Sequence, residues 1–344
     1  MGTRRAFLAI CVLVHCGGQV VGDDTVPQDA ALIEADDHDG IHEGGVEAQV
    51  LAANQAAPVH IALDEDYVYW TNFGQGDDGS VVRCAKSGCG GAPTVLASNL
   101  FAPDAIAVDD TTVYWGNRTG GQGSGIYSCA KIGCDADAGP TVLASGSTAI
   151  TNIALSATEI YWTSMSNDIK ACAKDGCGLA PTTFVTDEEP AGLTTSATTL
   201  YWGSLDIAAC PLAGCGSPTV FATGQSDTQS VVIDGVNVYW TNYGGDTVMS
   251  CNLAGCGGKP TVIAKSPLTP NAIATDGTNV YWATSNGMAI LRCPVTGCGS
   301  NPPVVIVDNT FVAAIAVDDT SIYFTAVSPN ATSYKDGAVL KIPK

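Results

Sequence analysis

The chain has 344 residues, with 14 Lys and Arg against 34 Asp and Glu, and a formal net charge of −20. Hydrophobic residues make up 46% of it, which excludes a wholly disordered chain. The acid excess would repel a phosphate backbone, so we expect no nucleic-acid partner. At this length the chain forms either two or three small domains or one large β architecture.

The N-terminus has the pattern of an export signal. Arg4 and Arg5 precede an apolar run over 6–14, which is too short to span a bilayer but is typical of a signal peptide. The run leads to Cys16, and the sequence around it resembles the lipobox of bacterial lipoproteins, which implies lipidation of that cysteine. We expect a signal peptide over 1–16 and an extracytoplasmic protein, either an outer-surface lipoprotein or a secreted one. Contact with a membrane is expected only through this lipid anchor.

Residues 17–46 contain eight acidic residues and no Lys or Arg. They lack apolar periodicity, so we expect a disordered acidic linker there. The remainder, 47–344, is expected to form one domain.

An aromatic pair recurs seven times along this domain, at intervals of 38 to 47 residues. The pairs are Tyr69-Trp70, Tyr114-Trp115, Tyr161-Trp162, Tyr201-Trp202, Tyr239-Trp240, Tyr281-Trp282 and Tyr323-Phe324. Four short runs rich in β-branched and aromatic residues surround each pair, bounded by Gly, Asp, Asn and Pro. Four strands in about 40–45 residues match one blade of a β-propeller.

The two ends of the domain complement each other. Residues 48–53 align with the fourth strand of a unit, whereas the last unit stops at Lys344 after three strands. We therefore predict an all-β, seven-bladed propeller of four-stranded blades, in which the N-terminal strand completes the last blade and closes the ring.

The aromatic pairs resemble the YWTD-type propeller repeats of lipoprotein-receptor ectodomains and related bacterial envelope proteins. The resemblance covers about 47–344 at the level of repeats. The Asp that follows the Thr in that family is replaced here by Asn, Ser, Thr or Ala, as in Tyr69-Trp70-Thr71-Asn72. The count of seven also departs from the usual six. The resemblance implies an extracytoplasmic binding scaffold and no particular ligand.

Twelve cysteines of the domain form six Cys-x4-Cys pairs between the third and fourth strands. A hairpin with Gly before the second Cys brings the two sulfurs together, so we predict disulfides. Zinc would need ligands from two such hairpins, and redox pairs usually have two residues between the cysteines. The predicted bridges join Cys84 with Cys89, Cys129 with Cys134, Cys172 with Cys177, Cys210 with Cys215, Cys251 with Cys256, and Cys293 with Cys298.

Propeller connectivity sorts the loops onto two faces. Connections between strands one and two and between three and four are monotonous, whereas those between strands two and three and between blades vary in length and content. Variation on one face of a rigid scaffold favours a binding face. Polar residues at the start of the first strands, which line the channel, are candidates for ligand binding or simply hydrate the funnel: His60, Asp104, Asn152, Gln229 and Asn271. Acids at the first turn of five units are interpreted as turn caps and not as calcium ligands: Asp64, Asp109, Asp234, Asp276 and Asp318.

The domain has one histidine, His60, which argues against catalytic triads and histidine–metal sites. We therefore expect a non-enzymatic, monomeric protein without cofactor or bound metal, which binds a protein or glycan through its variable face. Two alternatives stay open: a carbohydrate- or calcium-dependent hydrolase or lyase at the channel mouth, using carboxylates such as Asp77 and Asp104, and a purely structural envelope protein.

Overall fold

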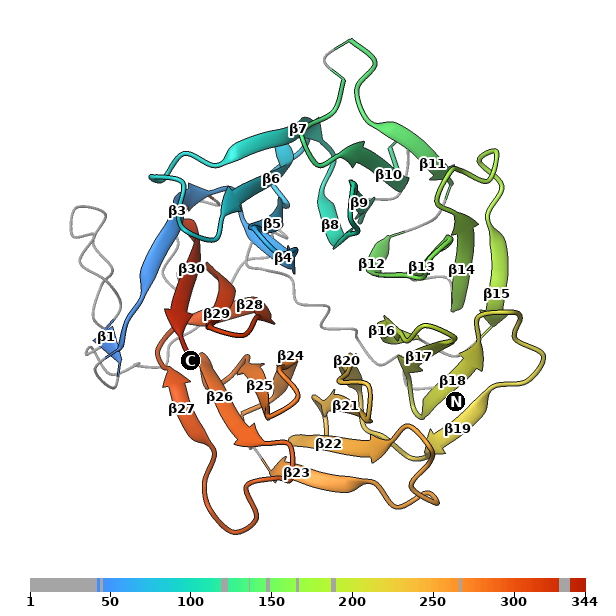
Figure 1. The fold of residues 1–344 in the computed structure, drawn as a ribbon, viewed down its shortest axis with the longest axis vertical. Helices are drawn as coiled ribbons and strands as arrows, with labels where there is room; N and C mark the ends of the chain where they lie inside the picture. Colours follow the sequence, from blue (N-terminus) through green and yellow to red (C-terminus); the bar gives the residue numbers. More distant parts are fainter. Residues whose placement is uncertain are drawn as a thin grey trace, which may run out of the picture.

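Seven four-stranded antiparallel sheets are arranged in a ring in the computed structural model (Figure 1). It describes residues 42–43, 46–118, 123–135, 137–146, 149–164, 167–186, 190–265, 268–327 and 335–344. The expected export signal, Cys16 and most of the expected acidic linker lie outside these residues. Within the expected linker, β1 (His42–Glu43) pairs with β2 (Val46–Glu47) in a short antiparallel ladder.

The blades follow one another in chain order. Blade 1 consists of β4 (Pro58–Leu63), β5 (Tyr67–Asn72), β6 (Gly79–Ala85) and β7 (Thr94–Leu100). Blade 2 consists of β8 (Pro103–Val108), β9 (Thr112–Asn117), β10 (Gly125–Ala130) and β11 (Thr141–Ser145). Blade 3 consists of β12 (Ile150–Leu155), β13 (Glu159–Ser164), β14 (Asp168–Ala173) and β15 (Thr182–Thr186). Blade 4 consists of β16 (Ala191–Thr195), β17 (Thr199–Gly203), β18 (Ile207–Pro211) and β19 (Thr219–Ala222).

The remaining blades repeat the pattern. Blade 5 consists of β20 (Thr228–Ile233), β21 (Asn237–Asn242), β22 (Thr247–Asn252) and β23 (Thr261–Lys265). Blade 6 consists of β24 (Pro270–Thr275), β25 (Asn279–Thr284), β26 (Ala289–Pro294) and β27 (Val304–Val307). Blade 7 consists of β28 (Phe311–Val317), β29 (Ser321–Val327), β30 (Gly337–Pro343) and the N-terminal strand β3 (Gln49–Gln55). The predicted closure is confirmed, because β3 pairs antiparallel with β30.

The repeated aromatic pairs form the core between the sheets. Each lies on the second strand of its blade, and all six tryptophans are fully buried. Trp115 of blade 2 packs in one cluster with Tyr69 and Val81 of blade 1, and Trp162 of blade 3 packs with Tyr114 of blade 2. The pair therefore joins neighbouring blades, because its two side chains belong to different interfaces. This explains why the pair recurs in every repeat.

All six predicted disulfides are confirmed, with Cα–Cα distances of 4.9 to 5.4 Å. One bridge closes the hairpin between the third and fourth strands in each of blades 1 to 6. In that order they join Cys84 with Cys89, Cys129 with Cys134, Cys172 with Cys177, Cys210 with Cys215, Cys251 with Cys256, and Cys293 with Cys298. Six disulfides indicate folding in an oxidising compartment.

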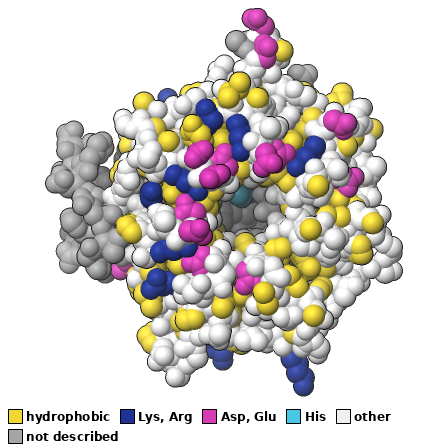
Figure 2. All heavy atoms as spheres, viewed as in Figure 1, with side chains coloured by type: hydrophobic (Ala, Val, Ile, Leu, Met, Phe, Trp, Pro, Cys, Tyr) yellow, Lys and Arg dark blue, Asp and Glu magenta, His cyan; other side chains and the backbone are white. Residues whose placement is uncertain are grey.

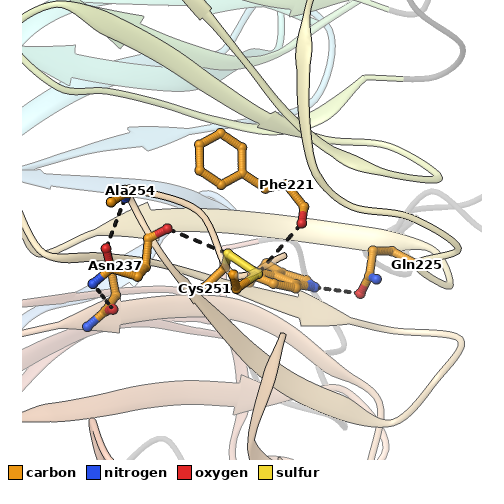
Figure 3. The surroundings of a disulfide bond; sticks show 8 residues. Phe221, Gln225, Asn237, Cys251 and Ala254 are labelled. Atoms are coloured by element: carbon orange, nitrogen blue, oxygen red, sulfur yellow. Dashed lines mark hydrogen bonds between the residues drawn. A yellow bond between two sulfur atoms is a disulfide. The ribbon is translucent and has the colours of Figure 1, made fainter. Parts of the chain in front are cut away.

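Some of these bridges also lie against the preceding blade. In blade 5, Cys256 Sγ is 3.6 Å from the Phe221 carbonyl oxygen of blade 4 (Figure 3). In blade 3, Cys177 Sγ is similarly 3.3 Å from the Leu143 oxygen of blade 2. Each of these two bridges thus closes a hairpin and also packs against the outer strand of its neighbour.

Candidate functional site

A β-bulge interrupts the first strand of every blade, within the three residues before the one that faces the tryptophan or its Phe324 counterpart. In blade 1 the register shifts between Pro58 and Ile61, and Ile61 faces Trp70. A bulge re-aims side chains, and such bulges are common beside functional sites. Because the first strands are innermost, the bulges surround the centre of the ring (Figure 1).

The bulges place the five predicted channel residues at two positions. His60 and Asn152 come directly before the residue opposite the tryptophan, whereas Asp104, Gln229 and Asn271 come one residue earlier. The sequence analysis treated them as one ring, although His60 and Asn152 precede their tryptophans by ten residues and the other three do so by eleven. The five residues therefore do not form one equivalent set.

The threonine after the aromatic pair fixes the bulge geometry. Thr71 Oγ1 accepts a hydrogen bond from His60 N at 3.3 Å and donates one to the Asp104 carbonyl oxygen of blade 2 at 2.6 Å. Thr241 and Thr325 make the same pair of bonds at blades 5 and 7. One buried hydroxyl thus orients a bulge and ties it to the next blade.

His60, Asp104 and Arg118 come together at the junction of blades 1 and 2. His60 Nδ1 lies 2.8 Å from Asp104 Oδ1, and an Arg118 guanidinium nitrogen lies 3.5 Å from Asp104 Oδ2. Asp104 is 2% exposed, so its carboxylate has lost most of its contact with water, and its interactions with His60 and Arg118 compensate for that loss. Arg118 follows β9, where its amide donates to the Ala102 carbonyl oxygen and so pairs the loop with the linker between the blades.

This arrangement defines the chemistry of His60. An ionised carboxylate only accepts hydrogen bonds, so a neutral His60 donates from Nδ1 and keeps its lone pair on Nε2. The His60 side chain is 39% exposed, so a ligand can reach the imidazole ring. The cluster can therefore offer one acceptor or base, together with the donor groups of Arg118.

The other predicted residues do not join this cluster. Asn271 is 4% exposed and donates to the Val312 carbonyl oxygen of blade 7 at 3.4 Å. Gln229 donates to Asp227 at 2.7 Å. Asn152 is half-buried, and its side chain makes no hydrogen bond to the described part of the chain. Asp77 is exposed on the loop after β5, and no hydrogen bond to Asp104 is found among the described residues.

The linkers that lead into the first strands hold non-glycine residues in the left-handed region. The φ values of Ala57, Ala102, Ala149, Asp227 and Thr269 lie between 44° and 55°. Such conformations are uncommon for side-chain-bearing residues, most of all for a β-branched one such as Thr269. Strain of this kind gathers at functional sites. It lies on the same face as the variable loops.

The turn acids are confirmed as caps, and most also belong to a network that the sequence analysis missed. Asp64 Oδ1 accepts the amides of Asp66 and Tyr67, and Oδ2 accepts the Tyr69 hydroxyl at 2.7 Å and pairs with Lys131 at 2.7 Å. Burial opposes ionisation of Asp64, but these hydrogen bonds outweigh it and lower its pKa to about 2. No cluster of three or more His, Cys, Asp or Glu able to hold a metal is found in the described ranges.

In four such networks the lysine comes from the following blade. The four ion pairs have N–O distances of 2.7 to 2.9 Å and join Lys131 with Asp64, Lys174 with Asp109, Lys86 with Asp318, and Lys344 with Asp276. Figure 2 shows this face, where acidic and basic side chains gather beside the central hollow. The sequence does contain a sign of these networks, because three of the four lysines lie in a recurring Cys-Ala-Lys motif: Cys84-Ala85-Lys86, Cys129-Ala130-Lys131 and Cys172-Ala173-Lys174. Arg118 had no such signal, because only the fold brings it to Asp104.

No family model matches the sequence, and no curated protein matches it. The fold is similar to virginiamycin B lyase from Staphylococcus aureus, with a TM-score of 0.68 and 16% identity over 87% of this chain and 99% of that one. A nidogen/laminin complex aligns at TM-score 0.51 and 16% identity, over 67% of this chain and 89% of that one. U3-55K aligns at TM-score 0.65 and 13% identity, over 86% and 98%. At these identities the likenesses establish the β-propeller fold alone, which is shared by enzymes and by proteins found in complexes.

Proposed function

We propose that this chain is an exported, non-catalytic propeller that binds a protein or glycan through its variable face, centred on the junction of blades 1 and 2. The observation that carries the proposal is the His60–Asp104–Arg118 cluster, in which a buried carboxylate holds two partly exposed polar side chains at the channel mouth. The seven repeats that build the ring do not require this cluster, since the equivalent positions in other blades carry different residues.

An apolar anchor lies beside the cluster. Phe101, in the linker between the two blades, is 46% exposed and directly precedes Ala102, whose carbonyl oxygen accepts the Arg118 amide. Leu205, on the loop between the second and third strands of blade 4, is 50% exposed. Exposed aromatic residues and arginine are the types that contribute most to protein interfaces, and aromatic rings also stack on sugars. The face therefore combines an aromatic ring, an arginine and a histidine on tied-down loops.

A screen of glycan and protein arrays with the purified, disulfide-bonded protein tests the proposal. We expect a ligand whose binding falls at least tenfold in Arg118→Ala and Phe101→Ala. Lys174→Met, on the opposite face, is the matched control and should bind normally. Binding that is lost in Lys174→Met and kept in the other two would place the interface on the wrong face and contradict the proposal.

A second function, a lyase or hydrolase at the channel mouth, is favoured by the His60–Asp104 pair itself. A histidine whose Nδ1 is held by a buried carboxylate is the usual arrangement of a general base, with Arg118 placed to stabilise negative charge on a substrate oxygen. Virginiamycin B lyase shares the fold, and one of its solved structures is a catalytically inactive histidine-to-alanine variant with quinupristin. Turnover of a bound ligand that disappears in His60→Gln while binding persists would favour this function over simple binding.

A further inference from the structure

Four blade junctions on the face that carries the cysteine hairpins share one arrangement. At each of them a lysine directly follows the third strand of one blade. Its side chain reaches a carboxylate and a tyrosine of the preceding blade. Its ammonium nitrogen lies 2.7 to 2.9 Å from the carboxylate and 5.7 to 6.0 Å from the tyrosine ring centre. Each junction is therefore a built receptor for a primary ammonium group, with an ion pair and a cation–π contact.

The other three junctions have an apolar residue in place of the lysine. Leu212, Leu253 and Val295 occupy the position, as their shared backbone bonds to Thr198, Val236 and Thr278 demonstrate. Lys131 makes the same bond to Thr111. These junctions thus keep the backbone frame of the receptor and lack its ligand.

One of these three junctions combines a cavity with a carboxylate. Between blades 3 and 4, a cavity of about 250 Å³ is lined by Glu159, Tyr161, Leu212 and the small residues Ala157, Ala197 and Ala213. The Tyr161 hydroxyl donates a hydrogen bond to Glu159 Oε2. Burial, followed by this bond to Glu159, raises the pKa of Tyr161. Among the described residues, no lysine or arginine forms an ion pair with Glu159.

We propose that the cavity between blades 3 and 4 binds a primary alkylammonium group, such as a lysine side chain or an alkyl diamine. The group takes the place that Lys131, Lys174, Lys86 and Lys344 hold at the four filled junctions. Its ammonium pairs with Glu159 over the Tyr161 ring, and its methylenes lie along Leu212 and the alanines. The strong net negative charge of the chain also favours the binding of a cationic ligand.

The chemistry of the cavity excludes the main alternatives. One carboxylate and one phenol, even with the hydroxyls of Ser156 and Thr158 that also line the cavity, fall short of the six to eight oxygen ligands that calcium takes. A quaternary ammonium is recognised by a cage of several rings, and this cavity has one. A primary ammonium needs only the acceptor and the ring that are present.

An intramolecular test fills the cavity with the protein's own side chain. Leu212→Lys restores the missing lysine, which should pair with Glu159. Adding Glu159→Gln should therefore lower the melting temperature of the Leu212→Lys variant by more than it lowers the melting temperature of the natural protein. Leu253→Lys is the matched control, because Ser196 and Thr199 provide no carboxylate at that junction. The lysine introduced there should form no ion pair and should not raise the melting temperature. Equal effects of Glu159→Gln in the natural and Leu212→Lys backgrounds would show that a lysine does not reach Glu159 and would overturn the proposal.

The intermolecular test uses N-acetyl-lysine methylamide as the probe and N-acetyl-norleucine methylamide as its uncharged control, followed by NMR. We expect saturable shifts of residues around Tyr161 with the lysine probe alone, at least tenfold weaker binding in Glu159→Gln, and none in Leu212→Lys. Cadaverine and a lysine-containing peptide then distinguish a free amine from a protein side chain. No saturable shift with any of these amines, or equal shifts with norleucine, would overturn the proposal.

Discussion

His60 and Asp104 lie 2.8 Å apart across the junction of blades 1 and 2, although 44 residues separate them in the chain. Both lie at β-bulges, and both are bonded to the hydroxyl of Thr71. The geometry of the candidate site therefore depends on a side chain that belongs to the repeat and not to the site. This dependence can be tested without knowing the ligand.

Replacing Thr71 with Val keeps the shape of the side chain and removes the hydroxyl. The His60 amide and the Asp104 carbonyl then lose a buried partner, so we expect a loss of about 1–3 kcal/mol in the free energy of unfolding, measured in urea. Thr94→Val, at an exposed position of β7, is the control and should change stability little. A neutral effect of Thr71→Val would show that the bulge does not need this hydroxyl.

Replacing Cys172 and Cys177 with Ser should lower the free energy of unfolding by about 2 kcal/mol, because the cross-link no longer restricts the unfolded chain. Calorimetry with and without reductant measures it. Because the bridge also lies against Leu143 of blade 2, hydrogen exchange of β11 should speed up as well. Asp175→Ala, exposed in the same hairpin, should leave both unchanged. Faster exchange confined to blade 3 would contradict the role of the bridge at the junction.

Acid should destabilise the ring through its turn carboxylates. Burial opposes ionisation of Asp64, and the bonds from Lys131, Tyr69 and the backbone lower its pKa from 3.8 to about 2, with the same direction at Asp109, Asp276 and Asp318. The folded state thus binds fewer protons between these values, so the stabilisation is complete above about pH 4 and is lost as the pH falls through about 2.

Melting temperatures measured from pH 7 to pH 2 check this expectation. Asp64→Asn should flatten the acid limb, and Lys131→Met should cost about 0.5 kcal/mol at neutral pH, as partly exposed ion pairs do. Lys259→Met, in an exposed hairpin of blade 5, serves as the control. An acid limb of the same steepness in Asp64→Asn would assign the acid sensitivity to other groups.

Alkali should act on the tyrosines of the same networks. Burial, followed by the bond to Asp109, raises the pKa of Tyr114 from 10.0 to about 12. The folded state therefore holds this proton where the unfolded chain releases it, and the stabilisation present below pH 10 is lost as the pH rises through about 12. Absorbance at the phenolate band should show these tyrosines ionising only with unfolding, whereas a separate step at pH 10 for all eleven would contradict the network.

The sequence was sufficient for the fold because each repeat carries its own local pattern. The aromatic pairs, the cysteine hairpins and the split last blade were all readable, and the structure confirms the strands, the closure and the disulfides. The site was less predictable. His60 and Asp104 were both named as channel residues, but the sequence did not show that they pair across two blades, and Arg118 reaches Asp104 from a loop.

The single histidine leaves one kind of catalytic arrangement open. One histidine excludes a histidine–metal cluster, but it does not exclude a histidine–carboxylate pair, because the carboxylate can come from another blade. The structure provides this partner in Asp104. Whether the pair binds or catalyses is therefore decided by the ligand and not by the count of histidines.

The most direct test of the central claim is hydrogen–deuterium exchange of the whole protein with and without the ligand found by the array screen. We predict protection of the variable face, namely Phe101–Asp104 and the loops after β5 and β21, with no change in the cysteine hairpins after β6 and β10. Protection confined to those hairpins, with the segment around Asp104 unchanged, would contradict the account.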